Sequence, residues 1–212
     1  LPFIDRYGVE AVRWFLAREF AFGSDGRFTP ELFASRINVD LANTYGNLIN
    51  RTVSMIIKYF DGVVPEIGEL NEFDKSLRDL TEQTIATYEN YMDDLKISEA
   101  LTSVGELLNA ANKYIEDSKP WVLSKEGNIP ALKNVMAILV NSIIVSSKLL
   151  SPVLVETIDK VYAQFGVSEN LRGYDVNHTF CPFAGLKVTK QDPLFPRLDV
   201  AVETEFINSI SK

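Results

Sequence analysis

Three side chains that could read a nucleic-acid base follow one another at four-residue intervals: Asn43, Asn47 and Arg51, in the stretch LANTYGNLINR. On a helix this spacing places them in a single row. An asparagine amide can pair with a base edge through both its donor and its acceptor, and arginine offers a planar fork of donors. The stretch also holds three asparagines and a glycine. These are poor helix residues, so a helix that keeps them needs a reason.

A second polar row precedes a proline–tryptophan pair. Asn109, Asn112 and Glu116 lie on one predicted helix, and Pro120 and Trp121 follow it. Single-stranded RNA loops are read by stacking on aromatic rings together with hydrogen bonds to splayed bases. Taken alone, these residues leave two interpretations open. The rows could read RNA, or they could be solvated helix faces beside a tryptophan that caps or fills the core.

The residue inventory argues against most enzyme chemistry. The sequence contains no G-x-S-x-G motif, no G-x-x-x-x-G-K-[ST] phosphate loop and no G-x-G-x-x-G fingerprint. Its one cysteine, Cys181, cannot form an intramolecular disulfide, which favours a cytosolic setting. Its one histidine, His178, leaves no zinc cluster and no Glu-x-x-His pair for a di-iron bundle. We therefore predict no catalytic residues, no metal and no cofactor in this chain.

Charge and hydropathy limit the possible partners. The formal net charge is −8, and residues 1–60 hold 7 Lys/Arg and 6 Asp/Glu, against 14 and 23 in the remainder. Because an acidic chain binds nucleic acid poorly without specific contacts, we expect no DNA partner and only a local contact with RNA. The most apolar stretch, residues 134–147, has 14 residues, fewer than the roughly 18 to 20 that span a bilayer. We interpret it as a buried core helix and expect no membrane partner.

Apolar periodicity predicts an all-α protein, an antiparallel helical bundle with a short helical preface. Thr29 as N-cap and Pro30 at the first helical position mark one helix start. Residues 131–150 are apolar nearly all round, so that helix should be central. Residues 166–199 look irregular, with room for short strands. The predicted helices cover 7–20, 37–60, 74–94, 98–116, 131–150, 152–165 and 202–210. Near one face of the first helix lie Val9, Val12, Phe15, Leu16 and Phe20. At the end of the third, Leu95 is expected to be buried.

Four stretches together carry a family resemblance. They are YGVEAVRWFLAREFAFGSDGRFTPE (7–31), DLANTYGNLINRT (40–52), ANKYIEDSKPWVL (111–123) and PLFPRLD (193–199). In this order they resemble methionyl-tRNA synthetase, over essentially the whole chain. The first stretch reads EAVR where many synthetases read DALR, which is a conservative departure. The family's catalytic Rossmann domain, with its HIGH-like and KMSKS motifs, comes first in such enzymes, and neither motif is present here. The resemblance therefore implies the C-terminal part of a longer chain.

In this family the chain would divide into three parts. Residues 1–36 would be the end of the stem-contact fold, and residues 37–165 the anticodon-binding helix bundle. Residues 166–212 would be an irregular C-terminal segment with a closing helix that packs back on the bundle. The implied partners are tRNA with a CAU anticodon and the catalytic domain of the same polypeptide, in the cytoplasm. ATP and methionine would bind that missing domain, which ligates methionine to tRNA, and this chain alone would be inactive.

The resemblance also implies roles for particular residues. The family's N-x-x-x-R pattern matches Asn47 and Arg51, and its P-W pair matches Trp121. In the family this tryptophan stacks on the first anticodon base, a cytosine, and the asparagine and arginine help to read that base. Asn43 lies one turn before Asn47 and is expected to join them. On the neighbouring helix, the further candidates are Asn109, Asn112 and Glu116.

Two other functions stay open from the sequence. Another class I synthetase, such as the cysteine, valine or leucine enzyme, shares the helical bundle and a variant of the YGVEAVRWFL helix. A helical scaffold or protein-docking module would bind no anticodon loop at all. Gly46 has two interpretations as well, because a glycine there could admit an RNA backbone or could serve simple helix packing.

Overall fold

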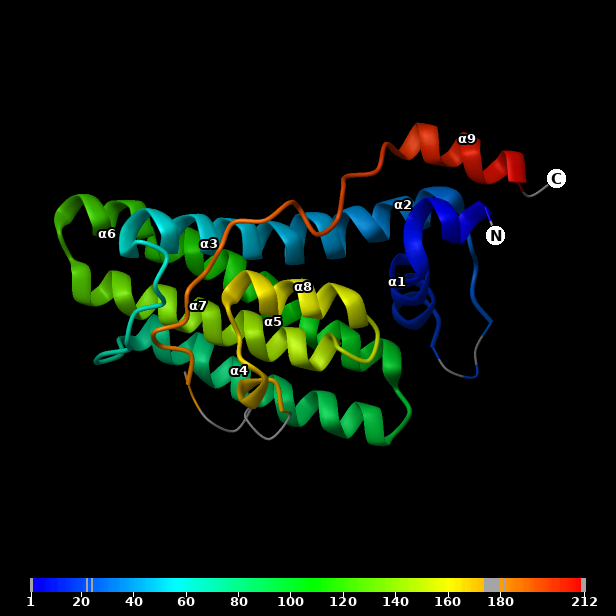
Figure 1. The fold of residues 1–212 in the computed structure, drawn as a ribbon. Coiled ribbons are helices and arrows are strands. Elements are labelled where there is room, and N and C mark those ends of the chain that lie inside the picture. The colour runs from blue at the N-terminus through cyan, green and yellow to red at the C-terminus, as the bar shows by residue number, and fades with distance from the viewer. Residues whose placement is uncertain (1, 22, 24, 174–179, 181, 211–212) are drawn as a thin grey trace.

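We describe the fold from a computed structural model that covers residues 2–21, 23, 25–173, 180 and 182–210 (Figure 1). Within these residues there is no strand, and only an isolated antiparallel bridge joins Val63 to Lys187. The predicted all-α class is therefore confirmed. Cys181 and His178 lie outside the described residues. The elements are α1 (Pro2–Glu19), α2 (Pro30–Arg36), the π-helix η1 (Ile37–Gly46), α3 (Asn47–Phe60), α4 (Glu72–Asp93), α5 (Ile97–Ser118), α6 (Pro120–Glu126), α7 (Ile129–Leu150), α8 (Val155–Phe165), the 3₁₀ turn η2 (Glu169–Leu171) and α9 (Val200–Ile210).

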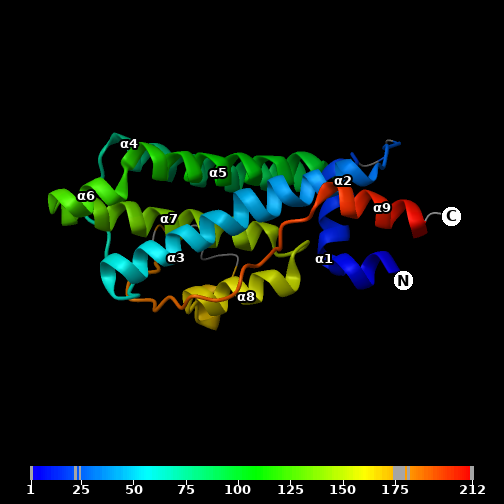
Figure 2. The same ribbon diagram turned by 90° about the horizontal axis from the view of Figure 1, so that it is seen from above.

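Helix α7 lies at the centre of the bundle because it is apolar on all sides. Residues 134–150 are all buried, and α3, α4, α5, α6 and α8 pack around the helix (Figure 2). By length and composition α7 could cross a membrane, but 78 % of its most apolar window is buried inside the protein. The prediction of a central core helix is confirmed. Full burial of each leucine or isoleucine contributes about 1.5–3 kcal/mol, so α7 fixes the helices that surround it.

One long helical rod runs from α2 through η1 to the end of α3 (Figure 1). It begins as predicted: the Thr29 hydroxyl accepts a hydrogen bond from the Leu32 N–H at 3.1 Å, and Pro30 lies in the first turn. The residues at both junctions of η1 have helical backbone angles. The predicted helix 37–60 is thus present. The expected division after residue 36 lies inside a continuous rod and not in a linker.

Helix α1 does not bury all of the apolar side chains that we predicted to lie near one of its faces. Val9 and Leu16 are each 51 % exposed. Contacts with the start of α8 set the rotation of α1: the Glu10 carboxylate accepts hydrogen bonds from two backbone N–H groups there, at 2.6 and 3.1 Å, and Arg13 donates to the Val153 carbonyl at 3.0 Å. These polar contacts outweigh the apolar pattern. The side chains that α1 buries are Ala11, Trp14 and Phe15.

Helices α4 and α5 form an antiparallel pair whose connection corrects another prediction. Leu95, expected to be buried, is 58 % exposed. It lies in the tight turn between the two helices with φ at 60°, a left-handed conformation that ends the apolar stripe of α4. At the other end of α4, a capping box is formed: the Asn71 side chain accepts from the Asp74 N–H, and the Asp74 carboxylate accepts from the Asn71 N–H.

Residues 182–199, here named the strap, cross from the α8 side of the bundle over α3 to α2 (Figures 1 and 2). Backbone hydrogen bonds join the strap to the loop after α3, with the Val64 N–H donating to Leu186 and the Gly185 N–H donating to Val64, both at 2.9 Å. Gly166 allows the close approach, because its φ is 65° and an added Cβ would lie 2.6 Å from the Lys187 carbonyl oxygen. The described part of 166–199 is largely irregular, as predicted, and the short strands for which the sequence left room are absent from it.

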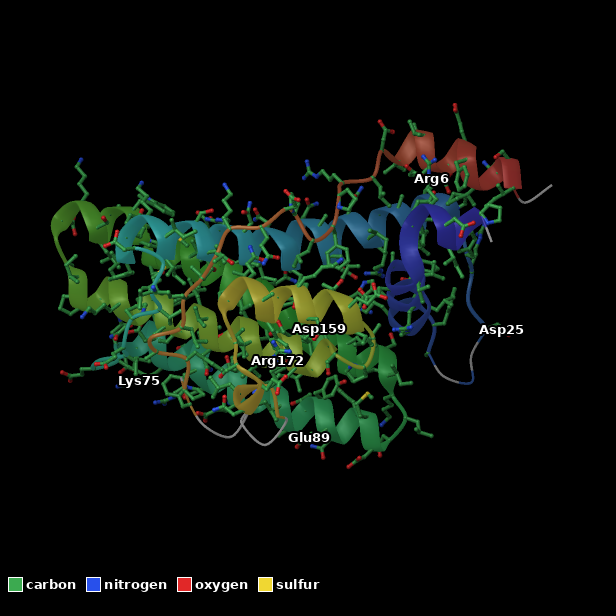
Figure 3. The ribbon with its side chains drawn as sticks, in the orientation of Figure 1. Arg6, Asp25, Lys75, Glu89, Asp159 and Arg172 are labelled. Atoms are coloured by element: carbon green, nitrogen blue, oxygen red, sulfur yellow. The ribbon has the colours of Figure 1, made fainter. Side chains whose placement is uncertain are left out.

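The closing helix is present, but the prediction that it packs back on the bundle was wrong. Helix α9 packs on α2 and α1. The reason is the Glu203 carboxylate, which is 6 % exposed and accepts hydrogen bonds from two residues of α1. One of these residues is Arg6, which is labelled in Figure 3. It accepts two hydrogen bonds from Arg6, at 2.6 and 3.0 Å, and one from the Tyr7 hydroxyl at 2.5 Å. The Arg6 guanidinium also lies 4.3 Å from the centre of the Phe206 ring. These contacts tie the two ends of the chain together.

We predict that acid weakens the docking of α9. The Arg6 guanidinium holds the pKa of the Glu203 carboxyl below its ordinary value of 4.5. A carboxyl whose pKa is lowered by folding stabilises the folded state fully at pH values above 4.5. This stabilisation is lost as the pH falls through the lowered pKa of the folded state. Glu203→Gln should therefore lower the Tm at neutral pH, and its difference from the native chain should shrink in acid. Thermal melts from neutral to acidic pH measure this Tm difference, with Glu205→Gln as the control at an exposed position. A difference that stays constant down to strong acid would contradict the interpretation.

Candidate nucleic-acid interface

The rod is π-helical over Ile37–Gly46, which includes Asn43 and Gly46 and ends directly before Asn47. At the end of η1, the Asn47 N–H donates to the Ala42 carbonyl five residues back, as well as to Thr44. Such wide turns are uncommon and occur frequently at functional sites. Gly46 has an ordinary helical φ of −63°, and a Cβ added there would lie 3.1 Å from the Leu41 carbonyl oxygen of the same rod. The nearest atom is therefore the rod's own backbone, which favours local helix packing as the reason for this glycine.

The first polar row is exposed and borders a groove. Asn43 and Asn47 are both exposed. Asn43 is oriented by the strap, because the Arg197 guanidinium donates to its side-chain oxygen at 2.8 and 3.1 Å. The groove has a volume of about 610 Å³ and lies between the rod and the strap. Its lining consists of Ala42, Asn43, Gly46, Asn47, Asn50, Pro193, Leu194, Phe195 and Arg197.

An ion pair brings the two predicted rows together. The Arg51 guanidinium on α3 donates to the Glu116 carboxylate on α5 at 2.5 Å. Their side chains are 31 % and 58 % exposed, so water screens the pair. Such pairs contribute about 0–1 kcal/mol. Some N–H groups of Arg51 could therefore donate to a ligand at a small cost in free energy, while Glu116 keeps the guanidinium on this face of the bundle.

The two asparagines of the second row touch the rod. The Thr44 hydroxyl donates to the Asn109 side-chain oxygen at 3.4 Å. The Asn112 amide donates to the Thr44 carbonyl at 3.1 Å and to the Leu108 carbonyl at 3.0 Å. The donors of Asn112 thus hold α5 against the π-helical backbone, which is a structural role. A reading role for either residue stays a prediction.

Trp121 is half-exposed, at 45 %, on the first turn of α6. Pro120, directly before it, is buried and anchors the start of that helix. Between α5 and α6 the backbone turns at Lys119, which has a left-handed φ of 46°. The tryptophan comes five residues after Glu116, the partner of Arg51. Its exposure is what a stacking platform requires, and it argues against the interpretation of Trp121 as a fully buried core residue.

Sequence reasoning missed part of this surface. Asn50 and the strap residues Phe195 and Arg197 line the groove but were not among the predicted site residues. The PLFPRLD stretch was recognised as part of the family resemblance, but no spacing rule predicts that its arginine contacts an asparagine more than 150 residues away in the chain. Among the described residues there is no group of three or more His, Cys, Asp or Glu that could hold a metal ion.

The helical fold and the matches to known proteins define a class: tRNA-ligase anticodon-binding domains. Residues 64–209 match the family model described as the anticodon binding domain of methionyl tRNA ligase. Residues 2–53 match the model described as tRNA synthetases class I (M). Because the first match covers most of the chain, the chain belongs to the family of methionyl-tRNA ligase anticodon-binding domains.

Individual relatives agree with this assignment. The chain is 44 % identical to methionine–tRNA ligase of Bacillus subtilis over 207 residues, which are 96 % of this chain and 31 % of that protein. The corresponding ligase of Halalkalibacterium halodurans is 44 % identical, over 99 % of this chain and 32 % of that protein. The chain therefore spans about a third of the length of the curated relatives it matches.

Solved structures give the same result. Mycobacterium tuberculosis methionyl-tRNA synthetase in complex with methionyl-adenylate superposes with a TM-score of 0.87 at 31 % identity, over 92 % of this chain and 39 % of that one. Its apo form gives a TM-score of 0.88 at 30 % identity, over 94 % of this chain and 41 % of that one. The fold described above is thus the fold of this family.

We predict that the two tryptophans respond differently to truncation. Trp14 is 3 % exposed, and Trp14→Ala should cost about 3–5 kcal/mol of unfolding free energy, as is usual for core aromatics. Trp121→Ala should cost clearly less, because nearly half of its side chain already faces water. Urea denaturation followed by circular dichroism compares the two. Equal losses of unfolding free energy in the two variants would mean that Trp121 is a core residue.

We also predict different stability effects for two asparagines of the site. Asn112→Ala removes the donors to two backbone carbonyls and should cost about 1 kcal/mol more than Asn47→Ala. The exposed Asn47 side chain should be replaceable with little change in stability. Chemical denaturation of both variants measures the difference. Identical free energies of unfolding would remove the structural role of Asn112.

Proposed function

We propose that this chain reads the CAU anticodon of methionine tRNA. In this proposal the first anticodon base, a cytosine, stacks on Trp121, and Asn47 and Arg51 hydrogen-bond to its edge. The observation that carries the proposal is the half-exposed Trp121 next to the α5 turn whose Glu116 holds Arg51. Membership in an anticodon-binding family supports it.

The donor pattern of arginine favours cytosine over uracil. Cytosine has an acceptor at its ring N3, where uracil carries an N–H. Arginine has donors and no acceptor, so a guanidinium aimed at that position pairs with cytosine and rejects uracil. The Asn47 amide can accept from the exocyclic amino group of cytosine, which uracil lacks. Asn43, held by Arg197, borders the same surface. On α5, Asn109 and Glu116 form the remaining part of this proposed reading surface.

Stacking and pairing supply the binding free energy. Stacking on an aromatic side chain is worth about 1–3 kcal/mol per base. Because the chain has a net charge of −8, phosphate attraction is weak and the contact depends on bases more than on backbone. The preference for one base should therefore depend less on salt concentration than the RNA affinity of a basic RNA-binding domain does.

The proposal extends to the longer protein that this chain represents. Its relatives carry the name methionine–tRNA ligase. We infer that the whole protein joins methionine to tRNA with ATP in the cytoplasm, that ATP and methionine bind its catalytic domain, and that this chain contributes tRNA selection without a catalytic group of its own. A DNA or membrane partner is not part of the proposal.

Two anticodon stem-loops that differ only in their first base, CAU and UAU, test the proposal. We predict that the chain prefers the CAU loop by at least about tenfold, the order expected for one well-formed pairing interaction. Arg51→Ala should abolish that preference. Arg78→Ala is the matched control, because Arg78 also forms a surface ion pair, with Asp79 on α4, outside the proposed site. Titrations at one stated salt concentration measure the binding of each loop to the native chain and to each of the two variants.

The same titration separates the rival functions. Stronger competition by an anticodon loop for cysteine, valine or leucine than by the CAU loop would indicate another synthetase specificity. Equal binding of both loops, or loss of preference in Arg78→Ala as well, would contradict the assigned reading residues. Binding of no loop would favour a scaffold.

A further inference from the structure

A buried polar cluster joins three helices behind the proposed reading surface. Its centre is Asp74 on α4, which is only 1 % exposed. One oxygen of its carboxylate accepts a hydrogen bond from the Tyr114 hydroxyl on α5 at 2.5 Å. The other accepts from the Asn71 N–H at 3.0 Å and from the Asn134 amide on α7 at 3.4 Å. A buried carboxylate is costly unless such donors surround it, so the cluster holds its members in fixed positions.

Tyr114 lies in the part of α5 that carries the site. Its carbonyl accepts a hydrogen bond from the Ser118 hydroxyl, and the next carbonyl, of Ile115, accepts from the Lys119 N–H at 3.1 Å. Lys119 then turns the chain into α6 and Trp121. The place of Trp121 is therefore set by the last turn of α5, and that turn is attached to α4 through the Tyr114 hydroxyl.

The same turn also places the partner of Arg51. Glu116 comes two residues after Tyr114, and its carboxylate holds the Arg51 guanidinium at 2.5 Å. A small shift of this turn would move the proposed stacking ring and the carboxylate that orients the proposed reading arginine. Neither Asp74 nor Tyr114 is part of the exposed surface, since Tyr114 is 5 % exposed.

We propose that Asp74 and Tyr114 are a positioning pair for anticodon reading: their hydrogen bond fixes the C-terminal turn of α5 and thereby the positions of Trp121 and Glu116. The inference rests on the proposed function and adds to it two buried residues that touch no RNA. Loss of the hydroxyl should therefore reduce selectivity in addition to stability.

Tyr114→Phe tests the pair, with Tyr7→Phe as the matched control. The Tyr7 hydroxyl also donates to a carboxylate, that of Glu203 at 2.5 Å, but it joins α1 to α9, and neither of these helices carries a residue of the proposed site. Both variants should unfold at lower denaturant. Only Tyr114→Phe should reduce the CAU-over-UAU preference, by about 2- to 30-fold, the range for residues that act on a site through their neighbours. Asp74→Asn, which keeps an acceptor for the hydroxyl, should keep more of the preference than Asp74→Ala.

A measurement without RNA separates this inference from the proposed function. The ¹⁵N–¹H heteronuclear NOE of the Trp121 indole reports fast motion of the ring, and Trp14 serves as the buried reference in the same spectrum. In Tyr114→Phe the Trp121 value should fall while that of Trp14 stays unchanged, and Tyr7→Phe should leave the Trp121 value unchanged. If the native chain shows no preference between the loops, the proposed function fails and the NOE alone decides the inference. If Tyr114→Phe keeps both the native preference and the native NOE, the positioning role is wrong.

Discussion

The burial of α7 is the constraint on which the arrangement of this protein depends. Three helices that carry residues of the proposed site, α3, α5 and α6, pack on this apolar helix, and the π-helix η1, which carries Asn43, packs on α5. Because residues 134–150 are buried on all sides, the relative positions of its neighbours follow from packing and not from the loops that connect them. Two rows of polar side chains that are some 60 residues apart in the chain thus come to face each other, and Arg51 reaches Glu116.

Local departures from ideal structure lie where the polar side chains lie. The rod is π-helical just before Asn47, the turn into α6 has a left-handed lysine, and the strap crosses beside the asparagines. Each departure is held by specific contacts: the Asn112 amide donates to the carbonyl of Thr44, and Arg197 donates to Asn43. Natural proteins break local rules mainly at functional sites, so this coincidence agrees with the site proposed here.

The sequence predicted what depends on local rules. The Thr29 N-cap, the central position of α7 and the existence of a closing helix all follow from capping or apolar periodicity, and all are present. The errors concern long-range choices. The rotation of α1 is set by Glu10 contacts with α8, and the docking of α9 by Arg6 contacts with Glu203, 197 residues away in the chain. No periodic pattern encodes such pairs. The strap side of the groove was missed for the same reason, whereas Asn47, Arg51 and Trp121 could be proposed because each belongs to a recognisable motif.

The most direct test of the account is an NMR titration that follows the two tryptophan indole N–H signals as the CAU stem-loop is added. The chain has only these two tryptophans, and they differ in exposure, at 45 % for Trp121 and 3 % for Trp14. If the first anticodon base stacks on Trp121, the Trp121 signal shifts and saturates with the RNA while the Trp14 signal keeps its position. A Trp121 signal that stays in place when the RNA is bound would contradict it, because the first anticodon base would then not be stacked on this ring.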